Sequence, residues 1–455
     1  MLSACLPFCH SPILTPPFRT EPGPLMDIAF DQRPIESRNV VSFLRQWSAL
    51  LPDIETQMGD AAHPARRALR GFLPPRRMTG DEWDLQQAAT LAGWCIFVPH
   101  GGRDVVAALP PLAALQATTD VAAVLAQVAA ARHTDDPAAH LFEMMLAQSA
   151  GDTRRRRGIY FTPQPLVRFI VQSVDTVLRD DFEIDDGLNG SSPGLNIVDP
   201  ACGTGVFLAE VQRRQKLLDH RLVGIDVMPA CCAAVRLILV ERPPVVHCAN
   251  ALQDVELSES VFLKQAGLPI VIGNPPYGNF GRKNQGDWIR KQLAEYKNGL
   301  NEQKINLDDD FIKFLRWGQY WIDRVGRGVL AMVTSNTYLR GLTHRQMRAS
   351  LLGSFDRAYF VDLQGDRKRN RTGLAANHDE NIFDIQQGVA VCVLARTGRH
   401  LTPRTAVARL TGSRSDKLRT LANSDIASIE QVTITPKPPR YFFQSVDRDP
   451  EDEQY

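Results

Sequence analysis

The chain has 455 residues, of which 44% are hydrophobic, and its formal net charge at pH 7 is +1. A chain of this length and composition can bury a large core and is expected to form more than one domain. The near-neutral charge does not by itself indicate a nucleic-acid-binding protein. The eight cysteines include no C-x-x-C pair, so we expect no metal site and reduced thiols in a cytoplasmic protein.

The N-terminal third of the chain is predicted to be a leader followed by helices. Residues 1–35 are rich in proline and are expected to be disordered, they lack the basic segment and apolar core of a secretion signal, and Met26 is an alternative start. Residues 36–150 are predicted to be mainly helical, with Ala-rich and Leu-rich stretches such as residues 121–128. Charges and prolines interrupt these stretches before any reaches the ~18 to 20 apolar residues of a membrane helix, so we expect no membrane partner.

A nucleotide-binding turn is predicted next, because residues 195–208 have the pattern of a strand, a tight turn and the start of a helix. Gly203 and Gly205 allow positive φ and a close backbone approach to a ligand, while the helix start presents free N–H groups. A second predicted strand, residues 221–226, ends in Asp226, 21 residues after Gly205, near the ~20-residue offset at which an acid binds ribose hydroxyls. The turn lacks G-x-G-x-x-G, so it does not favour an NAD-dependent dehydrogenase.

The tetrapeptide Asn274-Pro275-Pro276-Tyr277 follows a predicted buried strand, residues 268–273, and indicates a site that methylates an exocyclic amine. Such an amine is a poor nucleophile because its lone pair is delocalised, and acceptors for both of its hydrogens can activate it. The side-chain oxygen of Asn274 and the carbonyl of Pro275 are candidates, held in place by the fixed φ of the two prolines. The ring of Tyr277 offers a stacking face worth roughly 1 to 3 kcal/mol per base. The alternative is that the proline pair only ends the strand.

In this order, the turn, the ribose acid and the tetrapeptide resemble the S-adenosylmethionine-dependent adenine-specific DNA methyltransferases, in particular the methyltransferase regions of large restriction-modification proteins. The resemblance covers roughly residues 140–396, and it includes further segments at residues 157–167, 307–312, 328–336, 381–384 and 388–391. It implies an α/β fold with a Rossmann-like, mostly parallel sheet and helices on both faces, preceded by the helical N-terminal region. It places the catalytic domain at residues 151–400.

The resemblance also implies contacts to S-adenosylmethionine as the cofactor. The expected contacts are a cap over its methionine end, an acid near its amino group, the glycine turn, the ribose acid and a residue near its adenine: Tyr160, Thr162 and Pro163; Asp199; Ala201, Gly203 and Gly205; Asp226; and Asn250. An asparagine that closes a strand is also common as a plain turn residue, so both interpretations of Asn250 stay open. Phe383 is a candidate for stacking on the target base opposite Tyr277, or alternatively a core residue.

Basic residues before, within and after the predicted catalytic motifs are candidates for DNA contacts: Arg154, Arg155, Arg156 and Arg157; Arg282 and Lys283; and Arg367, Lys368 and Arg369. A charge run is usually a solvated face. The position of these residues around the motifs also favours contacts with the phosphates of double-stranded DNA. The polar stretch at residues 278–306 is expected to be a mobile element that meets the substrate strand.

The sequence therefore predicts an enzyme that transfers a methyl group from S-adenosylmethionine to the N6 amine of adenine in DNA, within a restriction-modification or related defence system. Two alternatives stay open: a protein-glutamine or RNA methyltransferase, which would use the same tetrapeptide on another planar amine, and a non-catalytic remnant that binds DNA or a partner. In the related proteins a long region that reads the DNA target follows the catalytic domain. Residues 401–455 are only a C-terminal extension, interpreted as the start of a truncated recognition region or as a sign that a separate specificity subunit is needed.

Overall fold

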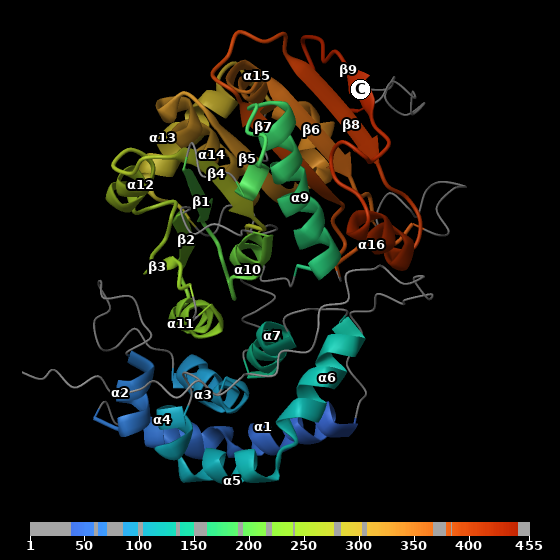
Figure 1. Ribbon diagram of the computed structural model, residues 1–455. Helices are drawn as coiled ribbons and strands as arrows, with labels where there is room; N and C mark the ends of the chain where they lie inside the picture. The colour runs from blue at the N-terminus through green and yellow to red at the C-terminus, as the bar shows by residue number, and fades with distance from the viewer. Residues whose placement is uncertain are drawn as a thin grey trace, which may run out of the picture.

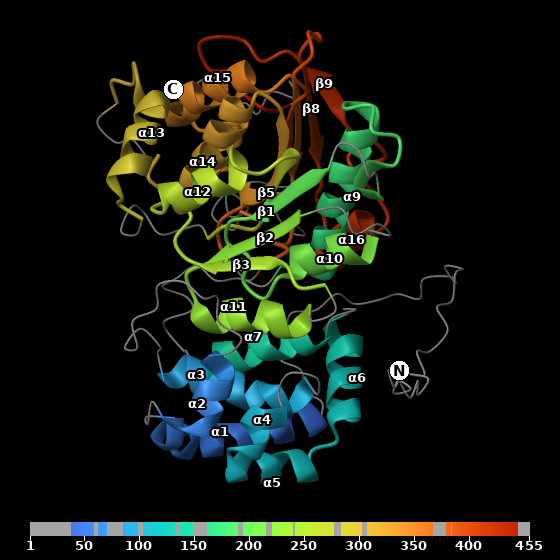
Figure 2. The same ribbon diagram turned by 60° about the vertical axis from the view of Figure 1, so that its left-hand side comes forward.

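The computed structural model describes a helical region and an α/β region (Figures 1 and 2). The described residues are 38–58, 62–70, 85–98, 103–132, 137–149, 162–189, 194–214, 221–239, 242–276, 284–302, 307–366, 379–383 and 385–444. The predicted leader, residues 1–35, lies outside them.

Seven α-helices form the described part of residues 38–149: α1 (Arg38–Met58), α2 (Pro64–Arg70), α3 (Leu85–Trp94), α4 (Arg103–Ala107), α5 (Pro110–Thr118), α6 (Val121–Arg132) and α7 (Pro137–Ser149), with a 3-10 turn η1 (Cys95–Phe97) after α3. Large aromatic side chains fill the core between them, and Trp47, Trp94 and Phe142 are fully buried. The indole Nε1 of Trp94 donates to the carbonyl of Ala138 at 2.8 Å, which joins α3 to α7. Within the described ranges no single helix is long and apolar enough to cross a membrane, although the bent pair 110–118 and 121–130 meets that test by length and composition.

The α/β region is built on one nine-stranded sheet with the order β3-β2-β1-β4-β5-β7-β6-β8-β9. Its strands are β1 (Leu195–Asp199), β2 (Arg221–Asp226), β3 (Val245–Cys248), β4 (Leu268–Gly273), β5 (Gly328–Ser335), β6 (Arg357–Asp362), β7 (Val389–Arg396), β8 (Arg404–Arg409) and β9 (Val432–Ile434). The strands β1 to β5 pair in parallel, β7 runs antiparallel between β5 and β6, and β9 runs antiparallel to β8. The chain order reverses between β1 and β4, and ligands of open α/β sheets bind at the carboxyl ends of the strands at such a reversal.

Helices cover both faces of this sheet (Figure 1). Successive strand residues point to opposite faces, so Ile197 and Ile270 belong to one core and Val198 and Val271 to the other. The first core includes α9 (Gln164–Asp180), α10 (Val206–Arg214) and α16 (Arg414–Ala422), and the second includes α12 (Val255–Phe262), α13 (Asp287–Lys297), α14 (Asp310–Val325) and α15 (Arg345–Ser354). Short 3-10 turns are η2 (Gly187–Asn189), η3 (Asn336–Leu339) and η4 (Leu342–His344). The predicted fold class, a mostly parallel Rossmann-like sheet after a helical N-terminal region, is confirmed.

The helix α11 (Pro229–Ile238) joins the two regions, and both views place it between β3 and the N-terminal helices (Figures 1 and 2). Its residues Cys231, Ala233 and Ala234 are buried in one core with the N-terminal helices. Cys232, on the opposite side of the helix, belongs to the core of the sheet. Because α11 starts three residues after Asp226, the helical region packs directly behind one edge of the candidate site.

The sheet continues past residue 400, where the sequence places the end of the catalytic domain. β8 pairs in parallel with β6 from Arg357 to Asp362, and Ala406 and Ala408 are buried in the same core as α9. The small side chains of β8 give it a weak hydrophobic signal. In its described part the predicted extension, residues 401–455, is therefore a continuation of the α/β region rather than a separate unit.

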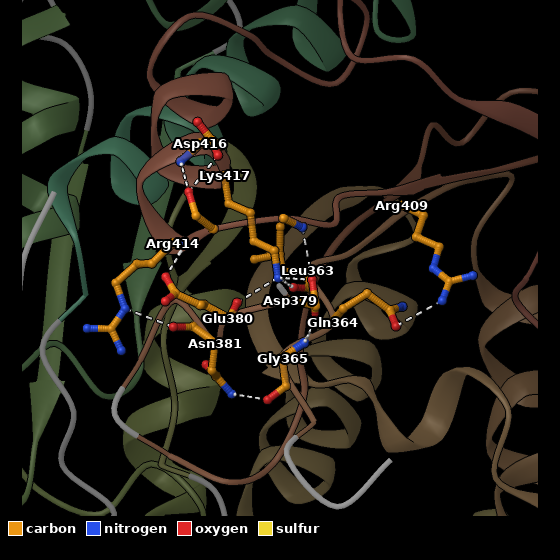
Figure 3. Close-up of polar contacts among 12 residues, drawn as sticks. Leu363, Gln364, Gly365, Asp379, Glu380, Asn381, Arg409, Arg414, Asp416 and Lys417 are labelled. Atoms are coloured by element: carbon orange, nitrogen blue, oxygen red, sulfur yellow. Dashed lines mark hydrogen bonds and ion pairs between the residues drawn. The ribbon is translucent and has the colours of Figure 1, made fainter. Parts of the chain in front are cut away.

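Lys417 on α16 ties this C-terminal part to the residues after β6 (Figure 3). Its side chain is 0% exposed, and its Nζ forms an ion pair with Asp379 Oδ1 at 2.7 Å. The same nitrogen donates to the carbonyls of Leu363 and Glu380, each at 2.7 Å. The other oxygen of Asp379 accepts from the backbone N–H of Gly365 at 2.8 Å. An ammonium group has three hydrogens, so these acceptors satisfy it, while burial lowers the pKa of Lys417.

Replacing Lys417 by methionine is expected to lower the free energy of unfolding by about 3 kcal/mol, because the Asp379 carboxylate loses its cationic partner and the carbonyls of Leu363 and Glu380 lose the hydrogen bonds from Nζ. Urea denaturation followed by circular dichroism measures the change. The same substitution at the exposed Lys264 is the control and is expected to change the free energy by no more than about 0.5 kcal/mol. Equal stability of the two variants would show that residues after 400 add little to the fold.

Candidate functional site

The carboxylate of Asp199 lies at the carboxyl end of β1, beside the end of β4. A Cβ atom on Gly273 would meet Asp199 Oδ1 at 2.7 Å, so only glycine lets the carboxylate rest against the residue before Asn274. Asp199 is 1% exposed, and its Oδ1 accepts from the backbone N–H of Ala201 at 3.1 Å. The pKa of Asp199 is raised to about 8, mainly because the carboxyl group is buried. The Ala201 hydrogen bond lowers this pKa and the nearby Asp226 carboxylate contributes to raising it. The carboxyl group is therefore placed to gain from a cationic ligand.

The glycine turn between β1 and α10 has the backbone that the sequence predicts. Gly203 has φ +51° and Gly205 has φ +83°, both in the left-handed region that favours glycine. A Cβ atom on Gly203 would meet no atom of the described residues within 4 Å, so those residues leave the space over this backbone open. Asp226 braces the turn, since its Oδ2 accepts from Gly203 N–H at 2.9 Å and its Oδ1 from Met228 N–H at 2.8 Å. A carboxylate has two acceptor oxygens, a geometry that suits the two hydroxyls of a diol.

Asn274 extends from the end of β4 toward the start of α9. Its Nδ2 donates to the hydroxyl of Thr162 at 3.0 Å, a contact between residues 112 positions apart. Its Oδ1 is buried and meets no hydrogen-bond donor among the described residues. A buried acceptor of this kind costs free energy unless a ligand supplies a donor, so the oxygen is available for an N–H group of a substrate.

Replacing Thr162 by valine removes the acceptor that orients the Asn274 amide, while the side chain keeps nearly the same volume. We expect the turnover rate to fall about tenfold, equivalent to the loss of one hydrogen bond of ~1.4 kcal/mol. Single-turnover measurements of methyl transfer give the rate. Threonine to serine at the same position keeps the hydroxyl and is expected to stay within about threefold of the unchanged protein, and equal rates in the valine and serine variants would contradict an orienting role.

The structure brings several of the predicted site residues to one edge of the sheet. Thr162, Pro163, Asp199, Ala201, Gly203, Gly205, Asp226, Asn274, Pro275 and Pro276 lie at the carboxyl ends of β1, β2 and β4 or at the start of α9 and α10. Asn250 follows β3, and its neighbour Ala249 donates its N–H to the backbone carbonyl of Asp226 at 2.9 Å. These positions agree with the predicted cofactor contacts, which stay predictions for each residue.

Other predicted residues lie apart from this edge or outside the described ranges. Phe383 is 1% exposed and is buried in the core that includes α9, with its N–H donated to Asn381 Oδ1 at 2.9 Å, so the structure does not present its ring at a surface. The predicted residues outside the described ranges are Tyr160, Tyr277, Arg154, Arg155, Arg156, Arg157, Arg282, Lys283, Arg367, Lys368 and Arg369. Within the described ranges no group of three or more His, Cys, Asp or Glu side chains could hold a metal ion.

Two contacts at the site have no counterpart in the sequence motifs. One is the Thr162 to Asn274 hydrogen bond, although both residues belong to motifs noted separately. The other is a chain of hydrogen bonds from Asn250 through Asn284 to Asp310. Asn284 lies in a polar stretch without periodicity, so no local pattern marks it.

Comparison with known proteins agrees with this geometry. Residues 133–353 match the family described as N-6 DNA Methylase. A curated relative, the Type I restriction enzyme EcoEI methylase subunit of Escherichia coli, is 25% identical over 146 residues, which is 29% of this chain and 25% of the relative. The chain thus spans about a quarter of that protein.

Two solved structures share the fold over most of the chain. One, described as a DrdV-DNA complex studied by cryoEM, has a TM-score of 0.62 and 21% identity, with 91% of this chain and 47% of that chain covered. The other, the ATP-dependent Type ISP restriction-modification enzyme LlaBIII bound to DNA, has a TM-score of 0.58 and 19% identity, with 89% and 32% covered.

The sheet, the glycine turn and the acids at its carboxyl edge define a Rossmann-like methyltransferase domain. Residues 133–353, more particularly, match the N-6 DNA Methylase family, and part of the chain is similar to a methylase subunit of a Type I restriction enzyme. The resemblance predicted from the motifs is confirmed for this region.

Proposed function

We propose that this chain transfers a methyl group from S-adenosylmethionine to the N6 amine of adenine in double-stranded DNA, as part of a restriction-modification or related defence system. The observation that carries the proposal is the buried Oδ1 of Asn274, which meets no donor among the described residues. The oxygen belongs to the residue that directly follows strand β4, at the edge where α/β sheets bind their ligands. An exocyclic amine supplies the N–H group that this oxygen lacks.

The residues at this edge fit S-adenosylmethionine as the cofactor. Asp199 would hold its amino group, the open backbone at Gly203 would lie under it, and Asp226 would accept from its ribose hydroxyls. The buried carboxyl of Asp199 and the left-handed backbone at Gly203, which no described residue covers, support this arrangement. When bound, the cofactor supplies an electrophilic methyl group, so the protein needs to provide alignment and activation of the amine rather than a strong base.

The chain's own residues would activate and position the amine. Asn274 Oδ1 accepts one amine hydrogen and the carbonyl of Pro275 accepts the other, which localises the lone pair on nitrogen. Thr162 holds the Asn274 amide so that its oxygen stays free for this contact. The new bond joins the amine nitrogen to the methyl carbon as the carbon–sulfur bond breaks, and the extra proton leaves to solvent or through Asn274. Tyr277 is the proposed stacking partner of the target base, because its aromatic ring offers a stacking face beside Asn274 in the sequence. Phe383 is not proposed for this role, since it is buried in the core.

The DNA-binding part of the proposal rests on the basic residues at 154–157, 282–283 and 367–369. Their charges would contact phosphates and give binding that weakens with salt. The bases that surround the target are proposed to be read by a separate specificity subunit or a further recognition region. A cytoplasmic location is proposed because that is where such a system meets DNA.

Transfer of a radiolabelled methyl group from S-adenosylmethionine to duplex DNA, bulk RNA and cell protein, measured in parallel, tests the proposed function. The label is expected in DNA, as N6-methyladenine after digestion to nucleosides. Label in RNA or on protein glutamine would instead favour the alternative that the chain is an RNA or protein-glutamine methyltransferase. Failure to bind the cofactor in calorimetry would favour a non-catalytic module that binds DNA or a partner.

A further inference from the structure

A chain of hydrogen bonds runs from the turn after β3 to the start of α14. Asn250 Nδ2 donates to Asn284 Oδ1 at 2.6 Å, and Asn284 Nδ2 donates to Asp310 Oδ2 at 2.9 Å. Asp310 Oδ1 forms an ion pair with Lys313 Nζ at 3.0 Å, with side chains only 1% and 2% exposed. At its other end, Asn250 Oδ1 accepts from Leu252 N–H at 3.0 Å. We refer to Lys313, Asp310, Asn284 and Asn250 as the amide relay.

The segment that carries Asn284 is packed against the turn after β3. A Cβ atom on Gly286 would meet Gln253 Cγ at 3.2 Å. Asn284 itself has φ +54°, a left-handed conformation that asparagine adopts more readily than most residues. Asn284 therefore has both the backbone and the neighbours that aim its side chain between Asn250 and Asp310.

The two ends of the amide relay fix the orientation of both amides. The orientation of an asparagine amide is ordinarily ambiguous, because its oxygen and nitrogen have the same shape. Here the carboxylate of Asp310, paired with Lys313, only accepts, so the nitrogen of Asn284 faces it and the oxygen faces Asn250. At the far end the N–H of Leu252 only donates, so it faces the oxygen of Asn250. Both ends require the same direction of donation along the relay.

This direction decides what Asn250 can offer to a ligand. One hydrogen of its Nδ2 is used by Asn284, and no second acceptor meets that nitrogen within the described ranges. Asn250 follows Ala249, whose N–H is bonded to the backbone of the ribose acid Asp226. The remaining N–H group is thus held at the edge where the cofactor adenine is proposed to lie, and ring nitrogens of adenine are acceptors.

We propose that Asp310 and Asn284 are positioning residues that hold Asn250 as a hydrogen-bond donor to a ring nitrogen of the cofactor adenine. The inference rests on the proposed cofactor site and adds two residues that do not themselves touch the ligand. Asp310 acts through its charge, which the buried Lys313 balances. Asn284 transmits the orientation from Asp310 to Asn250.

Calorimetry with S-adenosylhomocysteine, the product of methyl transfer, tests the inference. The protein is titrated with this ligand and with its 1-deaza, 3-deaza and 7-deaza analogues, each of which lacks one ring nitrogen. On the unchanged protein, one analogue is expected to bind about fivefold to tenfold more weakly than the parent, the worth of one hydrogen bond. Asp310→Asn and Asn284→Ala are each expected to weaken binding of the parent by about fivefold and to reduce the penalty of that analogue to about twofold or less.

Asp308→Asn is the matched control. Its ion pair with Lys297 is of similar length, 2.9 Å, but the two side chains are 48% and 34% exposed and neither belongs to the amide relay. This variant is expected to bind all four ligands as the unchanged protein does. Asn284→Ala leaves the Asp310–Lys313 pair intact, so it remains informative if Asp310→Asn does not fold.

The binding measurements distinguish failure of the proposed cofactor site from failure of the positioning role of Asp310 and Asn284. No binding of S-adenosylhomocysteine by the unchanged protein would overturn the proposed cofactor site itself. Normal binding without discrimination among the three analogues, or a penalty that persists in Asn284→Ala, would overturn only the inference. A double-mutant comparison of ligand and protein changes gives the coupling directly.

Discussion

Asn274→Ala is expected to lower the rate of methyl transfer by at least about 10²- to 10³-fold, the usual effect of removing a preorganised group that acts on the reacting atoms. Binding of S-adenosylhomocysteine should stay within about twofold. The reason lies in the geometry: the Asn274 oxygen is buried with no donor of its own among the described residues, whereas the cofactor contacts are assigned to other residues. Loss of the oxygen removes activation of the amine and leaves the glycine turn and both acids in place.

Single-turnover transfer of labelled methyl groups and calorimetry on the same preparation measure the two effects together. Asn301→Ala, at an exposed position, is the matched control and should keep both properties. Asn274→Asp keeps an oxygen acceptor but loses the N–H donated to Thr162, so a rate between those of the alanine variant and the unchanged protein is expected. Unchanged turnover in Asn274→Ala would remove the tetrapeptide from the active site.

The backbone of the glycine turn can be predicted from local sequence, because its conformation depends on a short segment of the chain. Gly203 and Gly205 are predicted to have positive φ, and they do. Asp226 is predicted from its spacing to bind ribose hydroxyls, which stays a prediction, and its carboxylate accepts a hydrogen bond from the glycine turn. These contacts connect elements that follow one another along the chain, so the number of residues between them in the sequence indicates which residues meet.

Long-range contacts account for what the sequence leaves undetermined. The acceptor that orients Asn274 is Thr162, 112 residues earlier, and nothing in either motif marks the pairing. Phe383 is predicted as a stacking residue or a core residue, and only packing against distant helices shows that it is buried. In the same way β8 becomes recognisable as a strand through its partner β6 rather than through its own short and weakly apolar sequence.

These long-range contacts also link parts of the molecule that the sequence treats as separate. The N-terminal helices share a core with α11, which starts directly after the ribose acid, and Lys417 ties the C-terminal residues to the loop after β6. The α/β region therefore packs against both the N-terminal helices and the C-terminal part of the described chain. Truncation at residue 150 or at residue 400 would cut through packed structure.

Asp199 is expected to make cofactor binding depend on pH. Burial raises the pKa of this carboxyl to about 8, so at pH 7 the free protein holds it mostly protonated. A cationic amino group beside it favours the ionised form and lowers its pKa, so binding at pH 7 should release close to one proton. Between pH 6 and 8 the affinity for S-adenosylhomocysteine should rise as the cost of removing that proton falls, and it should level off above pH 8.

Calorimetry at pH 7 in two buffers with different ionisation enthalpies counts the proton, and Asp199→Asn supplies the comparison. The variant should bind more weakly and release no proton at this position. The stability of the two proteins should also depend differently on pH. In the unchanged protein the folded state keeps the Asp199 proton up to about pH 8, whereas the unfolded chain loses it near pH 4. The unchanged protein therefore loses stability as the pH rises between these values. Asparagine has no proton to lose, so the melting temperature of the variant relative to the unchanged protein should increase from pH 5 to pH 9. A buried acid that lowers the stability of the free protein but binds a cationic group is typical of a binding site. A difference in melting temperature between Asp199→Asn and the unchanged protein that does not vary with pH would contradict this role of Asp199.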